Sequence, residues 1–342
     1  MFSVVVPTYA KPALLERALD SLARQVFPAV EIVVVRDGWM EEAPYAAAAG
    51  AAARRFGDRL RWLEVGRRAQ GSGPAFARNV GASAARYDYL AFLDDDDVWT
   101  DDGYLARAAR LLEREPAVDA VFADQTAVTP TGPVPGPLWL DRVATALVHP
   151  PPAGEPVAVD LELLLRAGGF CHLNTTIVRR AVFEELGGFD EQLRYEEDRD
   201  FFLRLIDRAG ELRYLPVTVA RHHVPAASDA VSASASLSWR AKLLDRARIF
   251  DKARLDGRHA ALRREGRRRK GETLKRLAEL LNAAGARGEA ASFALEALVL
   301  QPTGKWTLWT AWLLARALAS VGRPARRARP APPAVLARDR RG

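Results

Sequence analysis

Residues 89–99 read Tyr-Leu-Ala-Phe-Leu-Asp-Asp-Asp-Asp-Val-Trp, and the rest of the chain is organised around this stretch. Its apolar first half predicts a short buried strand. Four carboxylates, residues 94–97, follow directly, and because like charges repel and desolvation is costly, a cation is expected beside them. Mg²⁺ and Mn²⁺ prefer oxygen ligands and bridge carboxylates to phosphates, so the stretch predicts a metal–diphosphate site. The alternative is a helix start whose acids cap the first turn.

Strand-like and helix-like patterns alternate on both sides of this stretch. Strands are expected over residues 3–9, 31–35, 61–65, 118–123 and 212–219, and helices over 12–26, 43–56, 74–86, 104–115 and 181–186. Pro7 is expected to break the first strand. The alternation predicts an α/β fold with right-handed crossovers, in which ligands bind outside the carboxyl ends of the strands.

Three other segments carry groups that can bind a ligand. Residues 196–200 are Glu-Glu-Asp-Arg-Asp and precede an apolar helix, so Asp198 is either a functional carboxylate or a helix cap. Arg78 and Asn79 lie near the start of the helix over 74–86, where they can face a diphosphate; for Arg78 the alternative is surface solvation. The glycine-rich loop 71–73 lacks the lysine and spacing of a P-loop. The proline-rich segment 128–156 predicts a long loop over the sheet, in which His149 is expected to be a surface residue.

The composition of the 342 residues is that of a globular protein, with 49% apolar and 27% charged residues. The single cysteine, Cys171, excludes an internal disulfide framework and a cysteine-rich zinc site. The net charge of +7 is uneven: residues 258–276 hold nine Lys/Arg against two Glu, and residues 323–342 hold seven Arg against one Asp. These basic tracts have few aromatics, so no nucleic acid partner is expected. They indicate a solvated helix face and a loose tail, or attraction to an anionic membrane.

The C-terminal third is expected to be helical. Residues 274–284 and 290–300 predict a helical hairpin similar to one tetratricopeptide unit. Trp306, Trp309 and Trp312 form a stripe that either packs inside the protein or lies in a membrane interface. The apolar stretch 306–319 is shorter than the roughly 20 residues that span a bilayer, and no secretory signal is visible. A cytoplasmic protein, soluble or peripheral to the inner face of the membrane, is therefore expected.

Together these motifs resemble family 2 inverting glycosyltransferases of the GT-A fold. The segments that carry the resemblance are Val5–Tyr9, Val34–Gly38, Ala77–Asn79, Phe92–Asp97 with Trp99, Gly187–Asp190, and Glu197-Asp198 with Arg204-Leu205. The resemblance implies a Rossmann-like GT-A domain over residues 1–225. A helical extension over 226–322 and a disordered basic tail over 323–342 would follow it.

The resemblance also implies roles for individual residues in transfer from a nucleotide sugar. The family's Asp-x-Asp motif falls on Asp94 and Asp96, which would reach the ribose and a divalent Mn²⁺ or Mg²⁺ ion on the diphosphate. Asp198 matches the catalytic base, with Glu197 as the alternative base.

The remaining implied roles concern the donor pocket and the metal. Asp37 would read the nucleobase, and the pocket wall and other donor contacts would come from Pro7, Thr8, Tyr9, Arg78, Asn79 and Asp95. His223 would lie near the metal, with His222 as its competitor. The acceptor would be a saccharide or a lipid-linked sugar, in cell-surface polysaccharide or glycoconjugate synthesis.

Two departures from the family pattern leave other functions open. Arg36 stands where an acid is common, and Trp39 stands where a small hydroxyl residue is usual, so the nucleotide is not identified. With the basic C-terminal third, Arg36 also allows a non-catalytic scaffold that binds a nucleotide or an anionic surface. A nucleotidyltransferase would need a lysine-bearing glycine-rich loop, whereas Lys11 stands alone near the N-terminus.

Overall fold

The computed structural model describes residues 1–38, 42–65, 71–136, 138–140, 142–147, 152, 154–225 and 235–319. Three features discussed above, Trp39, His149 and the segment 323–342, lie outside these residues. The chain divides into two compact units, Met1–Leu237 and Ser238–Gly342.

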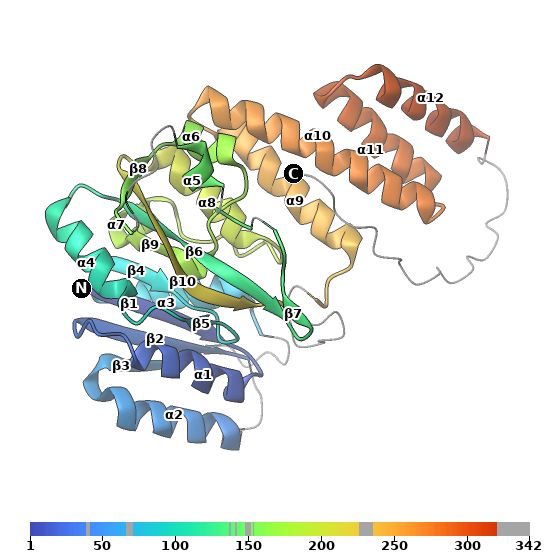
Figure 1. The fold of residues 1–342 in the computed structure, drawn as a ribbon. Helices are drawn as coiled ribbons and strands as arrows, with labels where there is room; N and C mark the ends of the chain where they lie inside the picture. Colours follow the sequence, from blue (N-terminus) through green and yellow to red (C-terminus); the bar gives the residue numbers. More distant parts are fainter. Residues whose placement is uncertain are drawn as a thin grey trace. The chain divides into compact units, whose positions relative to one another are not determined.

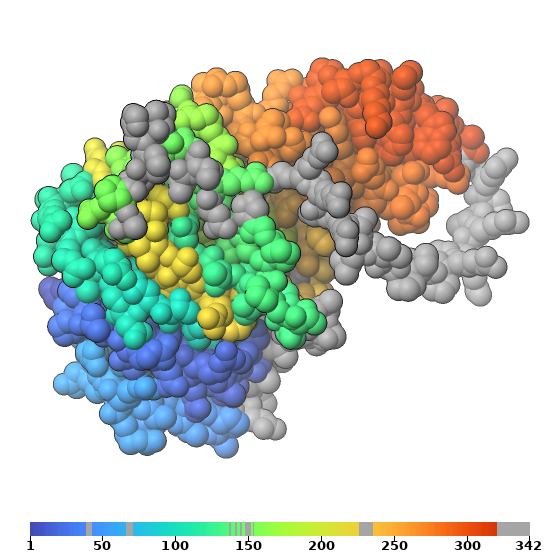
Figure 2. Space-filling model, viewed as in Figure 1, coloured from blue at the N-terminus to red at the C-terminus, as the bar shows by residue number. Residues whose placement is uncertain are grey.

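The first unit is built on one mixed sheet, in which ten strands are described. Their bounds are β1(Phe2–Thr8), β2(Val30–Asp37), β3(Leu60–Val65), β4(Tyr89–Phe92), β5(Val98–Trp99), β6(Ala120–Thr129), β7(Gly132–Pro133), β8(Val157–Val159), β9(Thr176–Arg179) and β10(Leu212–His223). The order is β3-β2-β1-β4-β9-β6-β10-β5, with β7 beside β6 and β8 beside β10. Figure 2 shows β10, in yellow, at the surface next to green residues of its neighbour β6.

The strand directions bring six carboxyl ends to one edge of the sheet. β1 is parallel to β2 and to β4, and β2 is parallel to β3. β9 is antiparallel to both β4 and β6, so β6 runs in the same direction as β4, and β10 is parallel to β6. The ends of β1, β2, β4 and β10 therefore meet at the edge where α/β sheets bind ligands (Figure 1).

Helices cover both faces of this sheet. Successive strand residues point to opposite faces, and apolar side chains on each face pack against helices. Val4 and Val6 pack with α1(Pro12–Ala23), α2(Glu42–Phe56) and α4(Tyr104–Arg114) in one buried cluster. Val5 faces the other way, toward α3(Pro74–Ala84).

Aromatic side chains continue this second layer. Phe92 of β4 packs against Phe183 of α7(Arg180–Glu185), and Phe122 of β6 packs against Phe202 of α8(Glu197–Arg208). The short helices α5(Val143–Ala146) and α6(Leu161–Ala167) lie in and after the proline-rich segment. The α/β fold with a Rossmann-like sheet is confirmed.

Pro7 does not end the first strand, and that prediction is wrong. β1 continues to Thr8, with Pro7 opposite Val35 of β2. On the other side, β4 pairs with β1 only as far as Val5, whose carbonyl accepts a hydrogen bond from Leu93 N. Pro7 is two residues further on, so its ring nitrogen points to this same side of β1. No described strand pairs with β1 at Pro7 on that side. The N–H that proline lacks therefore costs no hydrogen bond between strands.

The second unit is a set of packed helices: α9(Trp239–Asp256), α10(Ala260–Ala283), α11(Arg287–Leu300) and α12(Gly304–Leu318). α10 begins well before the helix predicted at residue 274. Apolar residues of α10, such as Leu277 and Leu281, share one core with Ala294 and Trp306. The Trp306 ring is buried and donates to the Ala294 carbonyl over 3.0 Å, whereas Trp312 is 44% exposed. None of the described helices has both the length and the hydropathy needed to cross a membrane.

Substituting Gly81→Ala tests the close approach of α3 to the sheet. A Cβ at Gly81 would lie 2.4 Å from Val5 Cγ1 and 3.0 Å from Val35 Cγ2, and neither branched strand residue can turn away. We expect the free energy of unfolding in urea to fall by about 1–3 kcal/mol. Gly50→Ala on α2 is the matched control, because there a Cβ meets only the end of the Arg54 side chain at 3.4 Å. It should be neutral or stabilise by up to about 1 kcal/mol. Equal effects of the two substitutions would contradict the packing described.

Candidate active site

The four aspartates after β4 form a turn at the carboxyl edge of the sheet, and no helix begins there. Asp97 N donates to the Asp94 carbonyl over 3.1 Å, and the next helix, α4, begins at Tyr104. Asn174 holds this turn from the segment before β9: its Oδ1 accepts from Asp94 N over 3.1 Å, and its Nδ2 donates to Asp97. The capping alternative for these acids therefore does not describe the structure.

Asp97 is a buried carboxylate that orients His222 at the end of β10. Its Oδ2 lies 2.8 Å from His222 Nδ1, and its Oδ1 accepts from His223 N over 2.6 Å. Although burial opposes ionisation, these hydrogen bonds hold the pKa of Asp97 below its usual range. Burial alone would lower the pKa of His222, but the hydrogen bond to Asp97 and its charge raise that pKa to about 9. With Nδ1 engaged by Asp97, the other ring nitrogen of His222 is left to meet a ligand.

His172 and Trp139 complete an aromatic group around His222. The His172 and His222 ring centroids lie 4.8 Å apart, and the Trp139 ring packs edge-on against both. Burial and the charge of His222 lower the pKa of His172 to about 4, so this ring is neutral at pH 7. Potential ligand atoms of Asp97, His172 and His222 lie within 4.8 Å of one another. Two imidazoles beside a carboxylate suit a divalent transition metal.

Backbone geometry holds Trp139 in this place. Its φ of 47° is left-handed, which is uncommon for a large side chain. Its carbonyl oxygen packs closely against Gly169, and a Cβ at position 169 would lie only 2.0 Å from that oxygen. Gly169 therefore lets the loop that carries Trp139 approach the segment that carries His172.

Asp95 and Asp96 face the end of β1. Asp95 Oδ2 accepts from Thr8 Oγ1 over 2.7 Å and from Tyr9 N over 3.2 Å. Burial and the charge of Asp96 raise the pKa of Asp95 to about 8, so it is mainly protonated at pH 7. Asp96 Oδ2 lies 2.6 Å from the Lys11 ammonium. Burial and the charge of Asp97 also raise the pKa of Asp96.

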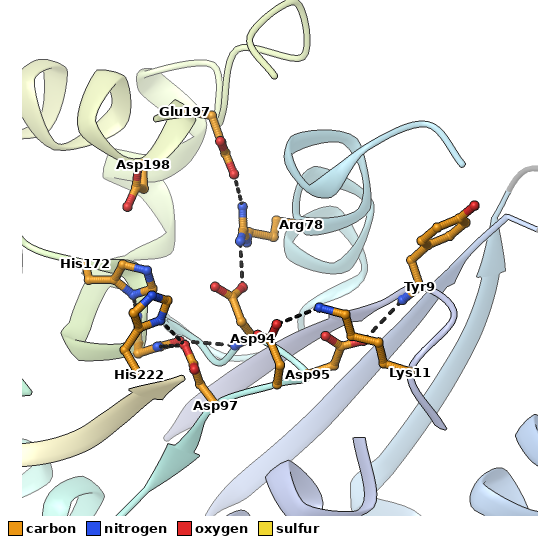
Figure 3. A network of polar contacts seen from close by, with 12 residues as sticks. Tyr9, Lys11, Arg78, Asp94, Asp95, Asp97, His172, Glu197, Asp198 and His222 are labelled. Atoms are coloured by element: carbon orange, nitrogen blue, oxygen red, sulfur yellow. Dashed lines mark hydrogen bonds and ion pairs between the residues drawn. The ribbon is translucent and has the colours of Figure 1, made fainter. Parts of the chain in front are cut away.

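Arg78 links the acidic turn to the start of α8. Its Nη2 lies 2.6 Å from Asp94 Oδ1, and its Nη1 lies 2.6 Å from Glu197 Oε1. The guanidinium is 5% exposed, so this is a buried two-carboxylate bridge rather than a solvated surface residue. Figure 3 shows Arg78 between Asp94 and Glu197, with the Asp198 side chain on the side of the acidic turn and the two histidines.

Asp198 is in the first turn of α8, where its Oδ1 accepts from Arg199 N over 2.8 Å. Glu196, the residue before α8, is strained, since it has a left-handed φ of 58°. Burial, followed by the charges of Glu197 and Glu196, raises the pKa of Asp198 to about 7, against the opposing charges of Arg78 and Arg199. A carboxylate with this pKa is suited to accept a proton near neutral pH.

The remaining predicted site residues surround the end of β2 and the start of α3. The Asp37 carboxylate accepts from the backbone N–H groups of Ser72 and Gly73 over 2.7–2.8 Å. Asn79 exchanges hydrogen bonds with the Phe189 backbone and so braces the segment before α8. Arg36 is turned toward β3, where it pairs with Glu64 over 3.1 Å.

The structure brings together residues that the sequence did not identify. The His223 ring lies 3.3 Å from Arg17 Nη2, and it is His222 that joins the cluster with His172. His172, Asn174 and Trp139 were not predicted as site residues, since they lie in a turn and in the proline-rich loop. For these three residues the sequence carries one signal. Trp139 is the lone tryptophan of the proline-rich segment 128–156, which was predicted to lie over the sheet.

Comparisons with known proteins agree with this fold. The model of glycosyl transferase family 2 matches residues 3–149. The succinoglycan biosynthesis protein ExoW of Rhizobium meliloti is 32% identical over 228 residues, which cover 62% of this chain and 68% of ExoW. The chain belongs to glycosyltransferase family 2, and it is a glycosyltransferase with the GT-A fold.

Two solved structures share this fold at lower identity. Residues 1–349 of TarS from S. aureus, in complex with UDP, give a TM-score of 0.62 at 20% identity, covering 93% of this chain and 88% of that one. Of a longer TarS structure the chain spans 53%. The mannosyltransferase PcManGT from Pyrobaculum calidifontis, in complex with GDP-Man and Mn²⁺, gives a TM-score of 0.56 at 23% identity, covering 95% of this chain and 88% of that one.

Two neighbouring aspartates should respond differently to the same substitution. Asp97→Asn removes a buried charge that accepts hydrogen bonds from His222, His223 and Asn174, and we expect a loss of about 3 kcal/mol in unfolding free energy. Asp95→Asn replaces a carboxyl group that is mainly neutral at pH 7, so its loss should stay below about 1 kcal/mol. Urea unfolding at pH 7 measures both. An Asp95→Asn loss equal to that of Asp97→Asn would contradict the neutral state of Asp95.

Proposed function

We propose that this glycosyltransferase moves a sugar from a nucleoside-diphosphate donor to an acceptor hydroxyl, with inversion and with a divalent metal ion. The observation that carries the proposal is the Arg78 bridge. It joins Asp94, on the donor side, to Glu197, the neighbour of Asp198, through two 2.6 Å contacts. The bridge therefore supports a single site that contains Asp94, which would contact the donor, and Asp198, whose pKa suits a general base.

The donor would lie along the carboxyl edge of the sheet, with its nucleobase near Asp37 and its diphosphate near the acidic turn. Pro7, Thr8 and Tyr9 lead from β1 toward Asp95 and would wall the base pocket. The backbone amides of Ser72 and Gly73, just before α3, donate to the Asp37 carboxylate and would hold it in place beside the nucleobase. UDP is bound to TarS and GDP-Man to PcManGT, which supports a nucleotide donor without choosing between the two bases.

The residues present fit a divalent metal. His172 has a neutral ring, His222 is oriented by Asp97, and the charges of Asp94 and Asp96 also act on His222. His222 and Asp96 would hold the ion, with His172 beside them and with Asp97 fixing the imidazole. Because the pKa of His222 is about 9, its free ring nitrogen would lose a proton on binding the ion. The ion, when bound, would neutralise the leaving diphosphate. Mn²⁺ in the related PcManGT structure supports this choice.

Asp198 would supply the base. Its carboxylate accepts the proton of the acceptor hydroxyl as that oxygen forms a bond to the anomeric carbon. The bond from this carbon to the diphosphate oxygen breaks on the opposite side, the electron pair leaves with the diphosphate, and the configuration inverts. General-base catalysis of this kind contributes roughly 10²–10⁴-fold.

The acceptor proposed is a saccharide or a lipid-linked sugar of a cell-surface polysaccharide or glycoconjugate. The relation to ExoW, named for succinoglycan biosynthesis, supports this class. We assign the transfer reaction to residues 1–225, with residues 226–322 as a helical extension and residues 323–342 as a separate basic tail. The chain would act at the cytoplasmic side of the membrane.

Asp198→Asn should leave donor binding intact and lower turnover by about 10²–10⁴-fold, because the base is lost without a change of shape. In the wild type, kcat/KM should rise with pH, reach half its maximum near pH 7 and level off above about pH 8, since Asp198 acts only when ionised and its pKa is about 7. Transfer from a panel of nucleotide sugars measures turnover, and calorimetry measures donor binding. Full turnover in the variant would exclude Asp198 as the base.

Glu197→Gln is the matched control for this prediction. It removes a charge that raises the pKa of Asp198 and leaves Arg78 free to stabilise the ionised base. The acid limb of the pH profile should therefore move to lower pH while activity persists. Complete loss of activity at every pH would make Glu197 the base instead.

EDTA should abolish transfer, and Mn²⁺ or Mg²⁺ should restore it. His222→Ala should raise the metal concentration needed for half-maximal activity by about 10–100-fold, because an oriented ligand is lost. His223→Ala is the matched control: that ring lies 3.3 Å from Arg17 and 3.7 Å from Asp97 but adds no ligand atom to the cluster, so the metal requirement should stay near that of the wild type. The reverse result would make His223 the ligand. Nucleotide binding that ignores both Mn²⁺ and EDTA, without transfer, would favour a non-catalytic scaffold.

A further inference from the structure

Helix α12 has two apolar faces, and only one of them is packed. Trp306, Thr310 and Leu313 are buried against the other helices of the unit. On the outer side, Leu308 is 76% exposed, Trp312 44% and Leu318 72%. Ala311 and Ala315, at helical spacing between them, are also exposed and continue the same apolar face. These five residues are called the outer face of α12 below.

The position of α12 makes this face unusual. α12 is the last described helix of its unit and packs on α11, as Figure 1 shows within this part of the chain. The end of a helical array normally presents a polar surface to water. An apolar outer face at such an end indicates that another surface covers it.

The charges around the outer face identify that surface. Residues 304–318 contain Lys305 and Arg316 and no acidic residue. The acids of the neighbouring helix α11 are already paired: Glu289 lies 2.5 Å from Arg240, and Glu296 lies 2.6 Å from Lys270. The sequence that follows α12, residues 320–342, adds seven Arg against one Asp. The partner must therefore be both apolar and anionic.

We propose that the outer face of α12 binds the surface of an anionic lipid bilayer, with Leu308, Trp312 and Leu318 entering the interface. The Arg316 guanidinium lies 4.4 Å from the centre of the Trp312 ring, so the ring can enter the headgroup layer while the charge stays at the phosphates. An apolar helix face followed by a basic segment provides the two signals that stable membrane attachment requires. A second copy of the chain fits less well, because two basic, acid-free helices would repel each other.

Sedimentation of the full chain with lipid vesicles tests this proposal. We expect binding to phosphatidylcholine vesicles that contain about 30% phosphatidylglycerol, and little binding to phosphatidylcholine alone. Raising the salt from about 0.1 M to about 0.5 M should weaken the binding. The double variant Leu308→Ser/Trp312→Ser should bind at least about tenfold more weakly. Both residues are exposed, so thermal unfolding should be unchanged.

The matched control is Trp239→Ser/Leu255→Ser, which removes a similarly exposed Trp and Leu from α9 and should bind as the wild type does. A cysteine introduced by Leu308→Cys gives a second readout, because Cys171 is buried and an environment-sensitive dye would label position 308. Its emission should shift to the blue with anionic vesicles.

Four results would overturn the proposal. The first is that the full chain does not bind anionic vesicles. The second is that the Leu308→Ser/Trp312→Ser variant binds as well as the wild type. The third is that the chain forms a lipid-independent dimer, which this variant abolishes. The fourth is binding by a chain that ends at residue 319 when the full chain does not bind, which would mean that residues 320–342 cover the face.

Discussion

The site depends on the bridge formed by one buried guanidinium. Arg78 lies on α3, Asp94 follows β4 and Glu197 begins α8, so three segments distant in sequence meet at a single side chain. Two carboxylates this close would repel each other without the positive charge between them. Both ion pairs raise the pKa of Arg78 further, so it stays charged at every accessible pH. Arg78 therefore holds the acidic turn and the start of α8 together.

Three aspartates of the acidic turn contact a basic side chain, whereas Asp95 contacts neutral donors. Each aspartate has a different partner: Arg78 for Asp94, hydroxyl and amide donors for Asp95, Lys11 for Asp96, and His222 for Asp97. These partners separate the protonation states of four identical side chains, with Asp95 mainly neutral and Asp97 ionised at pH 7. Adjacent residues of one type can therefore do different chemistry, because each side chain has different neighbours that shift its pKa.

Much of the fold could be predicted from the sequence, since buried strands and amphipathic helices leave strong periodic signals. The apolar run 89–93 and the helix that follows Pro74 are examples. Long-range pairing leaves no such signal. Pro7 stays in β1 because β4 ends early, and β10 extends to His223 because β6 continues beside it. The acidic turn was predicted, but Asn174 and His172 come from a single 3-10 turn and Trp139 from the proline-rich loop, where position is decided by tertiary contacts rather than by local pattern.

The Lys11 ammonium is a counter-ion that the protein itself supplies to the Asp96 carboxylate. The ammonium lies 2.6 Å from a carboxylate that a donor complex would use. In the proposed metal-dependent reaction, loading the site would be an exchange of cations, in which the Lys11 ammonium would give up its contact with Asp96. The flexible four-carbon stem keeps the released ammonium tethered beside β1, within reach of a nearby polyphosphate. One side chain would in this way neutralise the carboxylate in the resting protein and, in the proposed reaction, lie near the leaving diphosphate.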